Sequence, residues 1–187
     1  MKNIFEEAAA LQAFLTKQGF SFCFIGGLAL QRWGDLRTTN DIDLTLLTGF
    51  GGEESFIKTL LAHYEARIPD ALQTALDVRV LLLRSPTGVG IDIALGGLPF
   101  EEESIARSSE AEFLPGVSLR TCSAEDLIVY KAFAARPKDW IDLEGILLRQ
   151  RTLDWSYIEK QLKPLLELKE EPEHYGVLIA MRAKFQV

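Results

Sequence analysis

The segment from Phe24 to Leu46 constrains the fold most, because it joins an apolar strand pattern, a Gly-Gly pair and two acids in the sequence FIGGLALQRWGDLRTTNDIDLTL. Side chains alternate between the two faces of a strand, so Asp41 and Asp43 share one face while Ile42 and Leu44 point into a core. Two acids on one face repel each other, and the usual compensator is a divalent metal held by oxygen ligands. The segment therefore predicts a metal site on one face of a sheet.

Length and composition are those of an ordinary globular protein. A chain of 187 residues, 48% of them hydrophobic and 25% charged, can fill one domain with a helical appendage. Cys23 lies in an apolar run and Cys122 precedes a helix, so neither indicates a disulfide framework. The N-terminal sequence MKNIFEEAAALQAF has acids where a signal peptide needs positive charge, and no apolar run approaches the roughly 18 to 20 residues that span a bilayer. We expect a cytoplasmic protein that is not in the membrane.

The net charge of −7 is distributed unevenly. Residues 1–112 contain 9 Lys and Arg against 16 Asp and Glu, whereas residues 113–187 contain 11 of each kind. A protein that grips nucleic acid along an extended groove usually has a basic surface. Any contact with nucleic acid should therefore be local, and the neutral C-terminal half is the better place for it.

Apolar periodicity and turn residues predict alternating helices and strands as far as Arg120. We expect helices over residues 4–18, 28–33, 53–64 and 100–107, and strands over residues 21–25, 40–47, 77–83 and 89–95, with two short strands around Glu112 and residues 117–119. This alternation predicts an α/β (α+β) fold in which helices flank a mixed β-sheet over residues 1–120.

After Arg120 the periodicity is helical throughout, which predicts a C-terminal helical bundle over residues 121–187. Ser123 and Asp126 have the spacing of a capping box at the start of the first helix. A second helix should run from Pro137 to about Gln150, and two more should cover residues 154–163 and 172–184. Pro164 should end or kink the third helix.

Asp92 supplies a third acid, between Ile91 and Ile93 in a predicted strand. A carboxylate in an apolar strand is costly unless it is paired or coordinated. If the strands lie in one sheet, three carboxylates can converge on two metal ions about 3.5 to 4 Å apart. The Gly26-Gly27 turn at a helix N-terminus offers backbone N–H groups to phosphate oxygens. Together these features predict phosphoryl or nucleotidyl transfer.

In these motifs the sequence resembles the DNA polymerase β-type nucleotidyltransferase superfamily. The resemblance lies in Ile25-Gly26-Gly27, a 13-residue spacer, Asp41-Ile42-Asp43-Leu44 and the later Ile91-Asp92-Ile93. The run from Arg37 to Leu44, RTTNDIDL, is similar to the AbiEii/AbiGii toxin-like branch in particular. So are DLIVYK at residues 126–131, RPKD at residues 136–139 and DLE at residues 142–144. The resemblance covers roughly residues 20–150.

The resemblance implies an enzyme that transfers a nucleoside monophosphate from an NTP to a hydroxyl acceptor with two Mg²⁺ or Mn²⁺ ions. It implies that Asp41 and Asp43 bind both ions, and that Asp92 holds the catalytic ion and acts as, or positions, the general base. The remaining implied roles are nucleotide binding by Gly26, Gly27, Arg37, Thr39 and Lys131, and support of the site by Asp139 and Asp142. The helices after residue 120 would then complete the active-site cleft.

Several alternatives remain open at this stage. Lys131 could extend to solvent past Leu127, Asp139 and Asp142 could be acids favoured at a helix N-terminus, and Arg37 and Thr39 could be plain loop residues. The acceptor could be an RNA 3′ end, a protein or a small molecule. Some members of the superfamily are toxins encoded beside an antitoxin, so an antitoxin protein is a further expected partner. The alternative function is a catalytically silent module of the same fold that binds a nucleotide or regulates.

Overall fold

The computed structural model describes residues 3–185 and divides the chain into two compact units. Unit 1 comprises Met1–Leu28 and Thr38–Cys122, and unit 2 comprises Ala29–Arg37 and Ser123–Val187. The division after residue 120 stays a prediction, and the structure adds that residues 29–37 group with the C-terminal helices.

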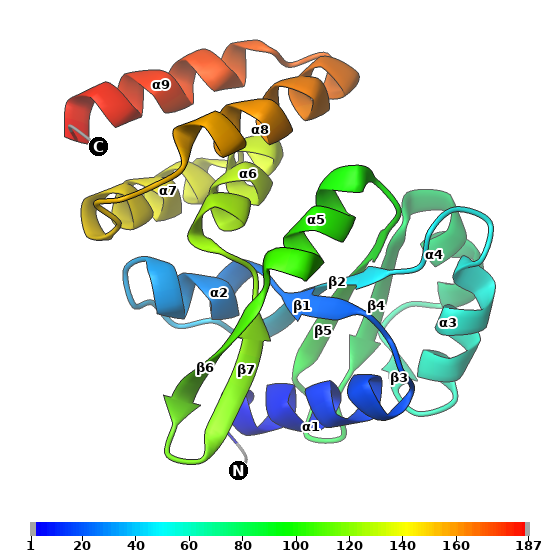
Figure 1. The fold of residues 1–187 in the computed structure, drawn as a ribbon. Coiled ribbons are helices and arrows are strands. Elements are labelled where there is room, and N and C mark those ends of the chain that lie inside the picture. Colours follow the sequence, from blue (N-terminus) through cyan, green and yellow to red (C-terminus); the bar gives the residue numbers. More distant parts are fainter. Residues whose placement is uncertain (1–2, 186–187) are drawn as a thin grey trace. The chain divides into compact units, whose positions relative to one another are not determined.

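Unit 1 is built on a mixed sheet of seven strands, counted within residues 3–185 (Figure 1). The sheet order is β3-β4-β5-β2-β1-β7-β6. Strand β2 is parallel to β5, and β1 is parallel to β7, whereas the other neighbours are antiparallel. The strands are β1 (Phe22–Phe24), β2 (Asp41–Leu47), β3 (Glu65–Ala66), β4 (Val80–Arg84), β5 (Gly90–Gly96), β6 (Ser109–Leu114) and β7 (Val117–Thr121).

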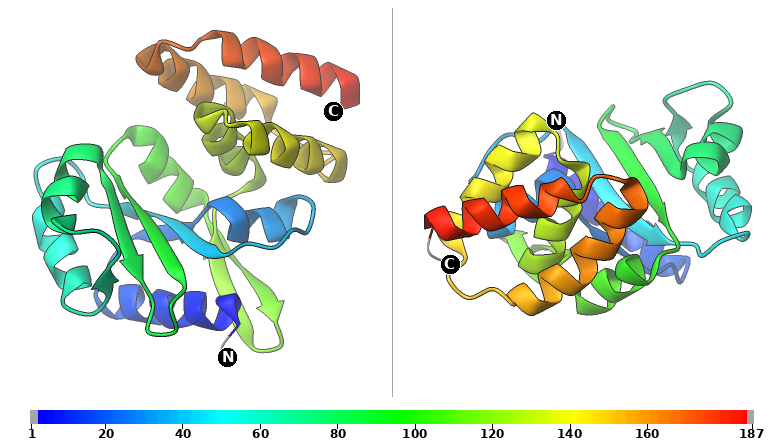
Figure 2. Two further views of the ribbon diagram at one scale, coloured as in Figure 1. Left: turned by 180° about the vertical axis from the view of Figure 1, so that it is seen from behind. Right: turned by 90° about the horizontal axis from the view of Figure 1, so that it is seen from above.

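One face of this sheet carries the main core of unit 1. Helix α1 (Ile4–Lys17) contributes Ala8, Leu11 and Leu15 to an apolar cluster that includes Ile42 and Leu44 of β2. Helices α3 (Glu53–Leu61) and α4 (Ala71–Val78) pack against each other, and α4 also packs against β4. Both lie at the β3–β4 side of the sheet (Figure 2). The alternation of side chains predicted for β2 is therefore confirmed, with Ile42 and Leu44 on the face that packs in the core.

Helix α5 (Pro99–Arg107) packs against β1 and β2. On β2, Thr45 shares a face with Asp41 and Asp43, and it is fully buried. A Cβ atom on Gly96 would meet both Thr45 Oγ1, at 3.1 Å, and Cβ of Glu101 in α5, at 3.3 Å. Helix α5 thus covers the Thr45 end of this face, whereas Asp41, at the start of β2, is exposed.

Unit 2 consists of helices. Helix α2 (Gly26–Trp33) begins in unit 1 and ends in unit 2, followed by α6 (Ala124–Ala134), α7 (Pro137–Arg149), α8 (Trp155–Lys169) and α9 (Glu173–Phe185). Helix α6 packs against α7, α8 and α9, which are coloured from yellow-green to red in Figure 1. The predicted capping box of Ser123 and Asp126 is present at the start of α6. Within residues 3–185, none of the helices is long and apolar enough to cross a membrane.

Three details differ from the sequence predictions. The strand predicted from residue 77 begins at Val80, because residues 71–78 form α4, and Arg79 then adopts a left-handed conformation between helix and strand. Strand β3 was not predicted, since two residues carry no periodicity. Pro164 does not end the third helix of the C-terminal region: α8 continues through it to Lys169, past the predicted end at residue 163. The buried residues Ile158, Leu162 and Leu166 lie on both sides of Pro164, and their packing stabilises the helix before and after it.

Candidate active site

The three predicted acids lie on neighbouring parallel strands of unit 1. Asp43 of β2 is paired in register with Asp92 of β5, and Asp41 is paired with Gly90. Adjacent strands lie about 4.8 Å apart, and paired residues point to the same face. Asp41, Asp43 and Asp92 therefore form one acidic group, named the acid triad below. The structure confirms that the three acids share one face of one sheet.

Glycines surround the acid triad where a side chain would not fit. A Cβ atom on Gly26 would overlap the carboxylate of Asp43, and a Cβ atom on Gly90 would overlap the carboxylate of Asp41. Gly26 also has φ of +55°, a left-handed conformation that favours glycine. The space next to the acids therefore depends on the absence of side chains at these two positions.

The Gly26-Gly27 pair places the first turn of α2 beside the acid triad. The Gly27 N–H donates to Asp43 Oδ2 over 3.4 Å. A Cβ atom on Gly27 would overlap Thr39 Oγ1, so Thr39 lies against the same turn, and its hydroxyl donates to the carbonyl oxygen of Asp41 over 3.2 Å. Four predicted site features, namely the Gly-Gly turn, Thr39, the β2 acids and Asp92, are brought together within unit 1.

The donor chemistry of this group fits a divalent cation. Carboxylate oxygens are the hard ligands that Mg²⁺ and Mn²⁺ prefer, and the side chains of Asp41 and Asp92 are 53% and 35% exposed. Within residues 3–185, no three His, Cys, Asp or Glu side chains are grouped closely enough to hold a metal ion as they stand. An arginine instead contacts two of the acids.

Arg67 is the residue that the sequence analysis missed. It follows β3 in unit 1, and its Nη2 donates to Asp92 Oδ1 while its Nη1 lies 4.0 Å from Asp41 Oδ1. Nothing in the spacing of the motifs points to this position. The available signal was electrostatic, because an arginine can compensate clustered carboxylates as a metal ion does.

A second charged group lies in unit 2 and contains the other predicted residues. Lys131 of α6 is 5% exposed and lies 3.1 Å from Asp139 Oδ1 and 2.7 Å from Asp142 Oδ2, measured from Nζ. Arg37 makes a two-point contact with Asp142, with Nε 2.9 Å from Oδ1 and Nη2 3.0 Å from Oδ2. Arg136 pairs with Asp139 over 2.6 Å. We name these five residues the Lys131 cluster.

The two acids of the Lys131 cluster are held in the charged form. Burial by itself raises the pKa of Asp139, but hydrogen bonds and charge from Arg136 and Lys131 outweigh it and leave that pKa below its usual value. Burial likewise raises the pKa of Asp142. Hydrogen bonds and charge from Arg37 and Lys131 outweigh this effect, so the pKa of Asp142 is also lowered. Lys131 therefore does not extend to solvent, and Asp139 and Asp142 do more than face a helix N-terminus.

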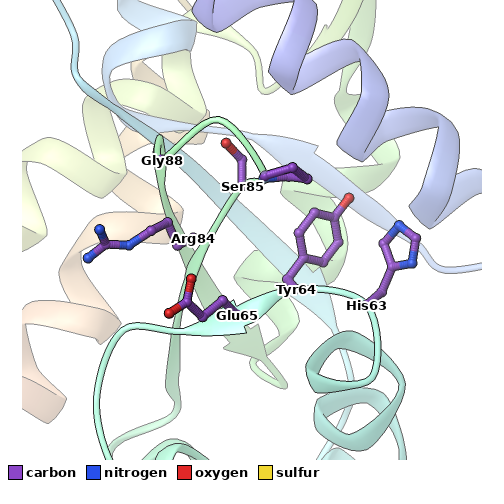
Figure 3. Close-up of a pocket in the computed structure, with 7 residues that line it drawn as sticks. His63, Tyr64, Glu65, Arg84, Ser85 and Gly88 are labelled. Carbon is purple, nitrogen blue, oxygen red and sulfur yellow. The ribbon is translucent and has the colours of Figure 1, made fainter.

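Unit 1 also contains a hollow of about 230 Å³ beside β3 and the β4–β5 turn (Figure 3). Its lining includes His63, Tyr64, Glu65, Arg84 and Ser85. The Tyr64 ring points toward the His63 side, whereas the Arg84 side chain extends in the opposite direction. Burial raises the pKa of Tyr64 to about 12, with a smaller contribution from the charge of Glu7.

Comparison with known proteins identifies the fold first. The chain is similar to an antigenic nucleotidyltransferase-like protein from Paracoccidioides brasiliensis, with 14% identity, a TM-score of 0.53, and 94% of this chain and 92% of that chain covered. It is also similar to the antibiotic-resistance factor ANT(2'')-Ia, with 20% identity, a TM-score of 0.54, and 92% and 95% covered. A third similar structure is the lincosamide antibiotic adenylyltransferase LnuA, with 11% identity, a TM-score of 0.51, and 75% and 94% covered. The fold is that of a nucleotidyltransferase.

The family is more specific than the fold. Residues 10–174 match the family described as "Nucleotidyl transferase AbiEii toxin, Type IV TA system", so the chain belongs to that family and is a nucleotidyltransferase. No curated protein matches the chain. The predicted resemblance to the AbiEii branch is confirmed, and the predicted mixed-sheet α/β fold is confirmed with it.

Proposed function

We propose that the chain transfers a nucleoside monophosphate from an NTP to a hydroxyl acceptor, using divalent ions bound by Asp41, Asp43 and Asp92. The observation that carries this proposal is the pairing of Asp43 with Asp92 on adjacent parallel strands, beside the Gly26-Gly27 turn. Membership of a nucleotidyltransferase family supports the same reaction. When bound, Mg²⁺ or Mn²⁺ would lower the pKa of the attacking hydroxyl and neutralise the leaving pyrophosphate.

Each part of the group has a role that follows from its chemistry. Asp41 and Asp43 would supply the shared oxygen ligands, and Asp92 would hold the acceptor side of the site, where a proton must leave the attacking hydroxyl. In the first turn of α2 the Gly27 N–H donates to Asp43 Oδ2, and the N–H groups at a helix N-terminus suit the phosphate oxygens of an NTP. Thr39, packed against Gly27, would fix the position of that turn.

Nucleotide binding by Arg37 and Lys131 stays a prediction from the family resemblance. Both residues are already engaged in unit 2, where Lys131 is 5% exposed and Arg37 holds Asp142 through two contacts. Arg37 retains more freedom, because 41% of its side chain is exposed. We therefore assign the first phosphate contacts to the Gly-Gly turn and treat the Lys131 cluster as support for unit 2.

The biological context extends the proposal. The family is described as the toxin of a type IV toxin–antitoxin system, so we propose a toxin role and an antitoxin protein as partner. The acceptor would be an RNA 3′ end, a protein or a small molecule, each of which offers a hydroxyl group. The similar structure named as a lincosamide antibiotic adenylyltransferase illustrates a small-molecule acceptor on the same fold.

Ligand-induced stabilisation tests the binding part of the proposal. Each NTP with Mg²⁺ should raise the melting temperature of the wild-type chain, because a ligand that binds only the folded state stabilises it. The double variant Asp41→Ala, Asp43→Ala should lose this shift. The control is Glu102→Ala, Glu103→Ala, which removes the same charge from an exposed part of α5. An unchanged shift in the double variant would contradict the assignment of the acids.

The role of Asp92 is tested by separating binding from turnover. Asp92→Ala should reduce turnover much more than nucleotide affinity, because the proposed role concerns the attacking hydroxyl. Isothermal titration with an NTP and a transfer assay on the same preparation give the two quantities. Equal losses in affinity and turnover would refute this division of labour.

A further inference from the structure

Arg67 places a positive charge inside the acid triad. Its guanidinium donates to Asp92 and lies 4.0 Å from Asp41, which bracket it from two neighbouring strands. Its backbone N–H donates to the carbonyl oxygen of Leu82 over 3.0 Å, which fixes the main chain beside the sheet. The side chain is only 23% exposed, so its charge is partly shielded from solvent at this position.

The guanidinium is held by charge and not by a complete set of hydrogen bonds. Arginine has five N–H donors in a rigid fork, and Nε of Arg67 is buried without a hydrogen-bond partner in the part of the chain that the structure describes. A buried donor without a partner costs free energy. Arg67 is therefore held at this position mainly by its contacts with the two carboxylates, and a cation that binds them can take its place.

Gly90 keeps the approach between Arg67 and the acids open. A Cβ atom at Gly90 would lie 2.9 Å from Nη1 of Arg67 and would overlap the carboxylate of Asp41. The Arg67 guanidinium and the Asp41 carboxylate thus both occupy the space beside the Gly90 Cα atom. A metal ion held by Asp41 and Asp92 would draw on the same two carboxylates that the guanidinium contacts.

We propose that Arg67 competes with divalent cations for Asp41 and Asp92, and so sets the affinity of the site for metal. Arg67 is then a positioning residue, which holds the acids ready without metal and must move when an ion binds. This inference rests on the proposed function, because it assumes that the acid triad is a metal site. It adds a residue that the sequence motifs do not assign.

Titration with Mn²⁺, followed by the loss of its free electron paramagnetic resonance signal, tests the competition directly. Arg67→Met removes the charge and should tighten Mn²⁺ binding about tenfold, the effect expected when one charge within about 4 to 6 Å of a carboxylate is removed. Arg67→Lys retains the charge and should stay within about twofold of wild type. If Arg67→Met does not fold, Arg67→Gln provides the same comparison with a polar side chain.

The control variant is Arg84→Met. Arg84 lies on β4, paired with Gly90, so it is in the same row across the sheet as Asp41. Among the described residues no ion pair joins it to the acid triad, and its side chain extends beside the hollow of Figure 3. The variant removes one positive charge nearby without removing the contact, so Mn²⁺ affinity should change less than about twofold, as for a screened surface charge.

The melting temperature in EDTA and in Mn²⁺ gives a second reading. Without metal, Arg67→Met should have a lower melting temperature than wild type, because the acids lose their counter-charge. Mn²⁺ should raise the melting temperature of Arg67→Met more than that of wild type or Arg84→Met. Equal Mn²⁺ affinities for wild type and Arg67→Met would overturn the competition and leave the metal site intact. An equal gain in Arg84→Met would also overturn it. Absence of Mn²⁺ binding in wild type and in every variant would overturn the metal site, and with it the proposed function.

Discussion

Replacing Lys131 with Met measures how much the Lys131 cluster contributes to the stability of unit 2. The ammonium group lies 2.7 Å from Asp142 and 3.1 Å from Asp139, and the two carboxylates are 4% and 0% exposed. Removing one partner of a buried ion pair typically costs about 3 to 5 kcal/mol. Arg37 and Arg136 remain as partners of the two acids, so we expect the lower end, about 3 kcal/mol.

Tryptophan fluorescence reports on this change selectively. The chain has three tryptophans, Trp33, Trp140 and Trp155, and all three lie in unit 2. Urea unfolding followed by fluorescence therefore gives the unfolding free energy of that unit. The control is Lys138→Met, an exposed lysine in the first turn of α7, whose loss should change stability by less than about 0.5 kcal/mol. A loss below about 1 kcal/mol in Lys131→Met would refute the reasoning.

The pH dependence adds an independent check. The pKa values of Asp139 and Asp142 are lowered in the folded chain, so their contribution to stability is complete above the unfolded value of about 3.9 and is lost as the pH falls through the folded values. Without Lys131 the folded pKa values should rise. The stability difference between wild type and Lys131→Met should therefore shrink as the pH falls below about 4. A constant difference would contradict the assignment of the two acids as the partners of Lys131.

Three further changes have definite expected results. Gly26→Ala should destabilise unit 1 by at least about 1 to 2 kcal/mol and weaken NTP-induced stabilisation, because a left-handed residue gains a Cβ atom that overlaps Asp43; a melting curve with and without NTP checks both effects. Because burial raises the pKa of Tyr64 to about 12, this residue contributes stability that is present below about pH 10 and is lost as the pH rises toward 12. Unfolding followed by circular dichroism at about pH 10 and about pH 12 should show this loss of stability in wild type and not in Tyr64→Phe. Pro164→Ala should stabilise unit 2 by up to about 3 kcal/mol, since Pro164 is exposed inside α8 and removes a helix hydrogen bond. Urea unfolding followed by fluorescence should show the higher unfolding free energy.

The fold was predictable where the sequence pattern is strong and local. The alternation around Asp41 and Asp43 and the apolar run around Asp92 gave strands whose pairing the structure confirms. Helix α4 was missed because it is short and lies between a turn and a strand whose boundary depends on the left-handed Arg79. Strand β3 exists through its pairing with β4, which no local pattern reveals. The end of the helix at Pro164 was predicted from local sequence, but buried residues on both sides of the proline favour a helix that continues to Lys169.

The candidate site was predictable to a similar extent. The acids and glycines could be found because their spacing reflects period two in strands and a turn that needs glycine. Lys131 was placed on a functional helix, but its enclosure by Asp139 and Asp142 depends on how α6 packs against α7. Arg67 could not be found from spacing, because it reaches the acids from a separate strand pair.

Nucleotidyl transfer itself is the central claim, and incubation with α-labelled NTP tests it most directly. Wild-type protein, Mg²⁺ and each of the four NTPs are supplied with separate pools of RNA, protein and small metabolites, and released pyrophosphate is measured beside the label. We predict that label enters one pool with an equal amount of pyrophosphate, and that Asp41→Ala, Asp43→Ala abolishes both while Glu102→Ala, Glu103→Ala leaves both unchanged. Transfer that persists in the Asp41 and Asp43 variant, or no transfer to any pool by wild type, would contradict the account.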